Sequence, residues 1–300
     1  MSLWIPVTIA AASFQTVRFM LQKVLSSVTL SPAGATFSRF VYSAPIILAG
    51  LAIYLAVSGQ KLPALPPQFW VFSAIGGLSQ ILATICVVSL FKQRNFAVGI
   101  TFKKTEVIQT AIVGLLVLGD QVSRWGWVAI ALGLSAVLVL SKNPGSDGAW
   151  WKHLTNRAAQ LGLGSGVLFA FSAVSYRGAS LQLGDLDPAF RAGITLAVVV
   201  CMQTLMMLVW LTWRDRAEIG RVWAARRVAV WVGLTSLGGS FCWFWAFSMQ
   251  NAAYVKALGQ VELILSILAT VLFFKEKISG REVLGMGLLV ASILALVLAI

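Results

Sequence analysis

The sequence predicts an all-α membrane protein with ten transmembrane helices, arranged as two inverted five-helix repeats. The first observation is the composition: 59% of the 300 residues are hydrophobic and 11% are charged, whereas a soluble domain carries about 25% charged residues. The second is a series of apolar runs close to the roughly 20 helical residues that a bilayer core requires. The third is a set of polar residues that recurs at constant spacing in both halves of the chain.

Ten apolar segments are separated by turns or charged residues. Pro32 and Pro188 open the second and seventh segments, at helix starts where the missing N–H does no harm. No Lys or Arg precedes the first segment, which therefore predicts a first span rather than a cleavable signal peptide. The predicted spans are 5–25, 32–57, 69–91, 97–118 and 122–141 in the first half, and 161–181, 188–213, 228–249, 253–274 and 279–299 in the second.

The two halves are related by a shift of 156 positions, which places Glu106 on Glu262. The same shift pairs Pro32 with Pro188, Asn95 with Asn251, Asp120 with Glu276 and Ser123 with Ser279. Five spans per repeat is an odd number, so the second copy enters the membrane in the opposite sense, as in transporters with inverted repeats. We therefore expect a first repeat over 1–145, a linker over 146–157 and a second repeat over 158–300.

Two stretches carry a family resemblance, LLVLGDQVSRWGWVAIALGLSAVLVLS (115–141) and VLFFKEKISGREVLGMGLLVASILALVLA (271–299). Each has an acidic residue at the end of the fourth or ninth span, a short turn and a last helix rich in small residues. With the Arg39-Phe40 pair, they resemble the drug/metabolite transporter superfamily, specifically its EamA-type ten-helix members. The resemblance implies a secondary transporter, with amino-acid exporters and sugar-phosphate carriers among its relatives. Val107 and Leu263 stand where that family often has a proline after the glutamate, so no proline kinks these helices.

Charged residues lie inside the fourth and ninth spans, where each costs about 2.5–3.5 kcal/mol unless it faces the bundle interior or a wet cavity. Lys103, Lys104 and Glu106 belong to the fourth span, and Lys256 and Glu262 to the ninth. Arg18 and Arg177 add further positive charge from the first and sixth spans. Because cations outnumber acids here, we expect Lys103, Lys256 and Arg18 to bind a carboxylate or phosphate. Glu106 and Glu262 would orient the lysines or carry a coupling proton.

A structural reading of these groups remains open. For Glu106 and Glu262, pairing with lysines to hold helices together weighs as much as a functional role. For Arg39 and Arg191, near span starts, snorkelling or packing is favoured over substrate contact. The predicted substrate-binding set is completed by Gln260 and by the aromatic residues Trp243, Trp245 and Tyr176, although the two tryptophans fit core or lipid-facing positions equally well.

Enzyme chemistry, metals and cofactors are not expected. The chain has one histidine, His153, and three cysteines in separate apolar segments, which leaves no histidine cluster or CxxC pair for a catalytic or metal site. No GxxxxGK[ST] motif predicts ATP binding. The net charge of +13 lies mostly in short loops beside spans, so it indicates topology and lipid headgroups rather than nucleic acid.

The leading prediction is therefore a secondary active transporter that moves a small polar metabolite, an organic anion or amino acid, by alternating access. The alternatives are an exporter of lipophilic or cationic compounds, a membrane-embedded enzyme, and a non-transporting structural or regulatory membrane subunit. The expected partners are the substrate, the lipid bilayer and a coupling proton or counter-substrate, with the protein a monomer or homodimer in a bacterial inner membrane.

Two predictions of the orientation of the termini disagree. The loops after odd-numbered spans are rich in Lys and Arg, whereas those after even-numbered spans hold only Lys61 and Arg124. The positive-inside rule then predicts both termini outside. The family resemblance implies both termini in the cytoplasm.

Overall fold

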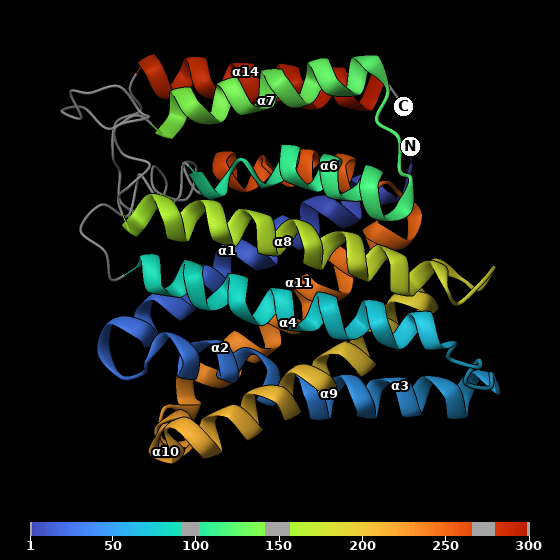
Figure 1. Ribbon diagram of the computed structural model, residues 1–300, viewed down its shortest axis with the longest axis vertical. Coiled ribbons are helices and arrows are strands. Elements are labelled where there is room, and N and C mark those ends of the chain that lie inside the picture. Colours follow the sequence, from blue (N-terminus) through green and yellow to red (C-terminus); the bar gives the residue numbers. More distant parts are fainter. Residues whose placement is uncertain (1, 92–101, 142–156, 266–279, 299–300) are drawn as a thin grey trace.

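The computed structural model of the protein describes residues 2–91, 102–141, 157–265 and 280–298, and within these ranges the ordered elements are α-helices. Figure 1 shows them as a bundle whose long helices run side by side, with both chain ends at the same end of the bundle. The helices are α1 (Trp4–Val28), α2 (Pro32–Val41), α3 (Ala44–Ser58), α4 (Pro67–Leu90), α6 (Glu106–Leu118), α7 (Arg124–Ser141), α8 (Arg157–Leu181), α9 (Pro188–Arg214), α10 (Arg216–Ala224), α11 (Arg226–Met249), α12 (Ala252–Leu258) and α14 (Gly280–Leu298).

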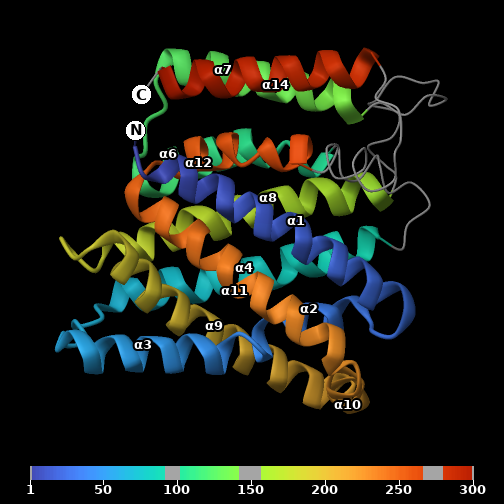
Figure 2. The same ribbon diagram turned by 180° about the vertical axis from the view of Figure 1, so that it is seen from behind.

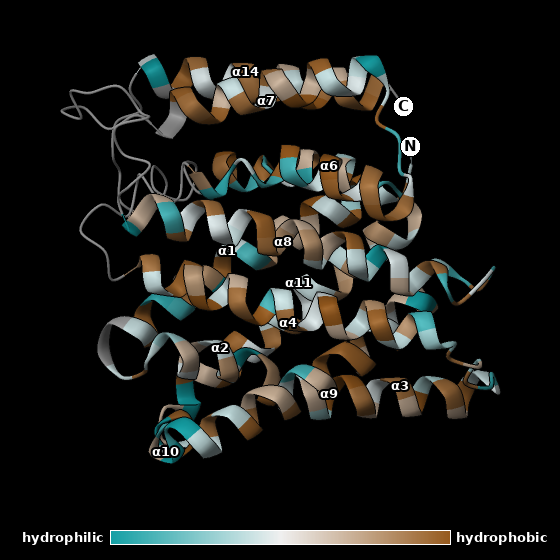
Figure 3. Cartoon of the chain, viewed as in Figure 1, coloured by the Kyte–Doolittle hydropathy of each residue, from teal (hydrophilic) through white to brown (hydrophobic). Residues whose placement is uncertain are grey.

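The surface and length of these helices are those of a multi-pass membrane protein. Counting α2 and α3 together, five helices of the described ranges are long and apolar enough to cross a bilayer, and 106–118, 124–139 and 283–298 form shorter apolar helices. Large apolar side chains such as Leu116, Val57 and Val209 are mostly exposed at the bundle surface, and hydrophobic residues cover much of every long helix in Figure 3. The all-α fold predicted from the composition is confirmed.

The second span is divided, although the sequence predicted one helix over 32–57. A continuous helix needs a hydrogen bond from the backbone N–H of residue 45 to the carbonyl of residue 41, and Pro45 has no N–H. The chain turns at residues 42 and 43, and the Ser43 hydroxyl donates to the carbonyls of Arg39 (2.7 Å) and Phe40 (3.1 Å). The turn leaves Arg39 at the inner end of α2.

The fourth and ninth spans are also interrupted, beside Glu106 and Glu262. The turns lie at residues 104–105 and 259–260, positions that the 156-residue shift superimposes to within one residue. The N–H of Thr105 bonds to the carbonyl of Phe102 at 3.2 Å, and that of Gln260 to Ala257 at 3.2 Å, which are the tighter three-residue steps of a 3₁₀ turn. Both helices therefore break without the proline that the family resemblance led us to look for.

The pairing of helices is symmetric between the two halves of the chain. In Figures 1 and 2, α1 lies along α11 and α4 lies along α8, while α7 packs against α14 at one edge of the bundle. α1 and α4 are the first and third spans of the first half, and α8 and α11 are the first and third spans of the second half. Exchanging the two halves therefore turns the α1–α11 contact into the α8–α4 contact. This pattern agrees with the inverted repeats predicted from the sequence. The predicted linker, 146–157, lies outside the described residues except for Arg157, which begins α8.

One end of the bundle is closed by polar contacts between the halves. Arg177 of α8 donates to both carboxylate oxygens of Asp120, at 2.7 and 3.3 Å. Its third nitrogen donates to the carbonyls of Phe247 and Gln250 at the end of α11, each at 2.9 Å. The side-chain amide of Asn251 adds a bond to the carbonyl of Gln121. Arg177, counted above among the surplus cations, is therefore neutralised by Asp120.

Close packing of α4 on α8 depends on Gly76. A Cβ atom there would lie 2.7 Å from Tyr176 Cε1 and 3.0 Å from Ser175 Cβ, whereas a Cβ at Gly50 meets nothing within 4 Å. We expect Gly76→Leu to lower the free energy of unfolding by about 1–3 kcal/mol, because overpacking forces the helices apart. Thermal unfolding of the purified protein measures this, with Gly50→Leu as the matched control. Equal melting temperatures for the two variants would contradict the packing.

Candidate functional site

A polar cavity lies in the middle of the bundle, between α1, α2, α4, α8, α11 and α12. Its volume is about 20 Å³, room for about one water molecule. Three cationic side chains from three different helices reach its wall, namely Arg18, Arg39 and Lys256. The other lining residues are Gln15, Gln80, Phe169, Ser172, Ala173, Tyr176, Gly239, Ser240, Trp243, Phe244 and Phe247.

Arg39 is held in this wall by neutral partners. Its guanidinium donates to the hydroxyls of Ser236 (2.7 Å), Thr84 (3.1 Å) and Ser240 (3.1 Å), and the residue is 3% exposed. Among the described residues no carboxylate forms an ion pair with it. The sequence analysis favoured snorkelling or packing for Arg39. Snorkelling is wrong, because the turn after α2 directs the side chain into the bundle.

Arg18 is the second buried guanidinium. It donates to Gln22 Oε1 at 2.9 Å and lies 4.3 Å from the centre of the Phe19 ring. Gln22 is fixed in turn by donating to the carbonyl of Ala35 at 3.0 Å. Arg18 and Gln22 therefore both face inward from α1, and Arg18 brings a positive charge to the cavity.

Three lysines and two glutamates form an ionic cluster beside the cavity. Lys104 makes a close ion pair with Glu262, whose other oxygen accepts from Gln15 Nε2 at 2.6 Å. The remaining pairs are longer: Lys103 lies 3.8 Å from Glu106 and 3.9 Å from Glu262, and Lys256 lies 3.8 Å from Glu106. These distances exceed a hydrogen bond, so Lys103 and Lys256 are attracted to the carboxylates without being bound to them.

The cluster also borders a second, more open cavity. Lys103, Lys104 and Glu262 line it together with Lys23 of α1 and Phe91, which follows α4. Its volume is about 200 Å³. These helix ends lie at the opposite end of the bundle from the Arg177–Asp120 pair. The ionic cluster therefore stands between an inner cavity and a vestibule at the end of the bundle away from the two termini.

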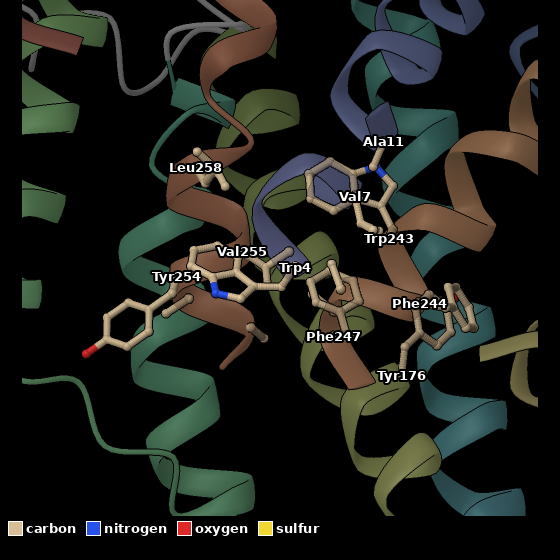
Figure 4. Close-up of a cluster of buried hydrophobic side chains, with 14 of the residues drawn as sticks. Trp4, Val7, Ala11, Tyr176, Trp243, Phe244, Phe247, Tyr254, Val255 and Leu258 are labelled. Atoms are coloured by element: carbon tan, nitrogen blue, oxygen red, sulfur yellow. The ribbon is translucent and has the colours of Figure 1, made fainter. Parts of the chain in front are cut away.

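The aromatic residues of the predicted substrate-binding set have different surroundings. Trp243 lines the inner cavity with the Lys256 ammonium 4.9 Å from its ring centre, and its indole N–H has no hydrogen-bond partner in the described residues. Tyr176 stacks on Phe244 at 4.2 Å and its hydroxyl accepts from Gln203 Nε2 at 3.2 Å. Figure 4 shows Trp243 against Val7 and Ala11 of α1, and Tyr176 beside Phe244.

Two members of the predicted set lie away from the cavity walls. Trp245 is half-buried and packs on Phe241, with ring centres 5.8 Å apart. Gln260 is buried in the α12 turn, with its amide nitrogen 3.5 Å from the carbonyl of Lys256 and its oxygen without a partner in the described residues. Whether either touches substrate stays a prediction.

Some site residues were not singled out by the sequence. The ring centre of Phe169 lies 5.4 Å from the ammonium nitrogens of both Lys103 and Lys256. In the sequence, nothing distinguishes Phe169 from other phenylalanines in apolar spans. Likewise, no pattern in the sequence singles out Gln80 as a residue of the cavity wall. Gln15 lies one turn before Arg18 on α1, and its bond to Glu262 joins α1 to the ionic cluster.

Comparison with known proteins finds relatives among transporters. Residues 156–298 match the EamA-like transporter family. The second half of the chain is therefore similar to the EamA-like transporters. A protein of Sinorhizobium sp. named "Uncharacterized transporter in cobO 3'region" is 24% identical over 123 residues, which cover 40% of this chain and 86% of that protein. A crystal structure with 14% identity matches the fold with a TM-score of 0.73, over 99% of this chain and 96% of the other.

The match and the name of the Sinorhizobium protein confirm the resemblance noted from the sequence. The match covers the second repeat, which contains α8 to α14 and therefore Lys256, Glu262 and Trp243. Together with the apolar helices, the match indicates an integral multi-pass membrane protein, and its cation-rich cavity lies between helices of both halves.

The Lys104–Glu262 pair is expected to be structural. Glu262→Gln leaves a buried lysine without its counter-charge and should cost about 3–5 kcal/mol of stability, whereas Glu262→Gln combined with Lys104→Met removes both charges and should cost less. Thermal unfolding of the two single variants and the double variant measures the coupling. If the double variant loses the sum of the single effects, the two residues do not stabilise each other.

Proposed function

We propose that this EamA-like transporter moves a small organic anion, bearing a carboxylate or phosphate, across a bacterial inner membrane. One observation carries the proposal. Five buried cations line the two cavities, namely Arg18, Arg39, Lys103, Lys104 and Lys256, whereas the ionic cluster beside them holds two acids, Glu106 and Glu262. Buried charges need neutralisation by partners of opposite sign, and a bound anion supplies the missing charge. An amino acid fits as well, because its carboxylate can meet the cations while its amine meets a glutamate.

The loose ion pairs support reversible binding. At 3.8–3.9 Å from the glutamates, Lys103 and Lys256 keep N–H donors that an incoming carboxylate can occupy at hydrogen-bond distance. Glu106 and Glu262 hold the lysines near the cavity when it is empty. A glutamate that loses its lysine to the substrate becomes a carrier for a coupling proton.

The proposed transport cycle is alternating access between the halves 1–145 and 158–300. The Arg177–Asp120 contacts close the end of the bundle near the termini, while the vestibule beside Lys103 and Lys104 lies towards the opposite end. The turns within the fourth and ninth spans would act as hinges next to the ionic cluster, because element ends are where backbone angles change in such movements. Movement about these hinges would open the Arg177 end and close the vestibule.

The lysines provide the direct test. Lys103→Ala and Lys256→Ala proteins should fold and insert normally but lose most anion uptake in proteoliposomes, because each removes a proposed ligand of the substrate. Lys61→Ala, the same change at an exposed loop position, is the matched control. Unchanged transport by both buried variants would remove these residues from the substrate site. Loss of folding would favour the structural reading of the cluster.

Orientation is a separate prediction. The excess of Lys and Arg in the loops after odd-numbered spans places those loops in the cytoplasm by the positive-inside rule. The vestibule would then open to the cytoplasm and the C-terminus would lie outside. A C-terminal fusion to alkaline phosphatase should be active, and a fusion to green fluorescent protein dark. The reverse result would show that both termini are cytoplasmic.

A further inference from the structure

α10 joins α9 to α11 and has two different faces. Its inner face carries Glu218 and Val222, which are 1% and 2% exposed. Glu218 accepts from both the backbone N–H and the hydroxyl of Ser31, each at 2.7 Å, and the carbonyl of Val222 accepts from Tyr42 Oη at 3.2 Å. α10 is therefore fixed to both ends of α2.

The outer face of this region is basic and aromatic. Arg214, Arg216, Arg226 and Arg227 are exposed, and among the described residues none of the four forms an ion pair with a carboxylate, since Asp215 and Glu218 both pair with Arg221. Two tryptophans flank the arginines, Trp213 at 86% and Trp223 at 65% exposure. The Arg226 guanidinium lies 5.7 Å from the centre of the Trp223 ring. We call these six residues the α10 surface.

The position of the α10 surface is that of a membrane interface. In Figure 1 the long helices run across the view, whereas α10 is seen end-on where α9 ends and α11 begins. Its axis therefore lies across the spans, in the plane of the bilayer. Exposed tryptophans at span ends are characteristic of the headgroup region, and clustered arginines beside them attract negatively charged lipid headgroups.

We propose that the α10 surface binds the headgroups of anionic phospholipids. The four arginines supply charge-assisted donors to the phosphate oxygens, and the two tryptophans sit at the boundary between headgroup and acyl chain. A bound lipid holds α10 against the start of α2, because Glu218 on the inner face bonds to Ser31. The same helix carries Arg39 at its other end, so the lipid supports the wall of the inner cavity. This binding is independent of which substrate is transported.

Native mass spectrometry of the detergent-purified protein tests the proposal. The protein is incubated with equimolar phosphatidylglycerol and phosphatidylcholine, and the retained lipid is counted. The wild type should retain phosphatidylglycerol preferentially, and Arg214→Gln/Arg216→Gln and Arg226→Gln/Arg227→Gln should each weaken this preference by about fivefold for every arginine removed. Inorganic phosphate in excess should not displace the lipid.

The control is Arg124→Gln, which removes an exposed arginine at the opposite end of the bundle and should leave lipid retention unchanged. All variants are compared at matched thermal stability, and the two pair variants serve as independent tests if one of them misfolds. Equal retention of both lipids by the wild type, or equal phosphatidylglycerol retention by the wild type and a folded pair variant, would overturn the proposal. Displacement by phosphate would show a free-anion site instead.

Discussion

The central constraint in this protein is the cost of holding ammonium and guanidinium groups inside a bundle of apolar helices. Each such group must find a partner of opposite charge, a set of hydrogen-bond acceptors or water. Lys104 meets this requirement with Glu262, Arg177 with Asp120, and Arg39 with three hydroxyls. Lys103 and Lys256 are only loosely paired, which leaves their charge available to a ligand.

The helix breaks follow from the same constraint. The turns at residues 104–105 and 259–260 lie next to the charged cluster in both halves, so each break has charged side chains beside it. Non-helical backbone at membrane depth is tolerated where it is buried in protein or lines a cavity. The close approach of α4 to α8, through Gly76, completes the enclosure.

The arginines outside the cavity have different roles because their surroundings differ. Arg177 is surrounded by a carboxylate and two helix-end carbonyls, and it fastens α8 to the ends of α6 and α11. Those at the α10 surface face outward beside exposed tryptophans. Arg39 faces a cavity without a carboxylate. The same side chain therefore closes the bundle, faces outward or lines the cavity, according to which groups the fold places opposite it.

Much of the fold and part of the site follow from the sequence. Composition and apolar runs determine an all-α membrane protein, and the 156-residue recurrence of Glu106 at Glu262 relates its halves, because apolar length and residue spacing are local properties of the chain. Only the tertiary structure decided which charges meet. Lys104, rather than Lys103, holds Glu262, and Arg39 enters the cavity because the chain turns before Pro45. Such pairings join residues as much as about 200 positions apart, and no local pattern encodes a distance set by how whole helices pack.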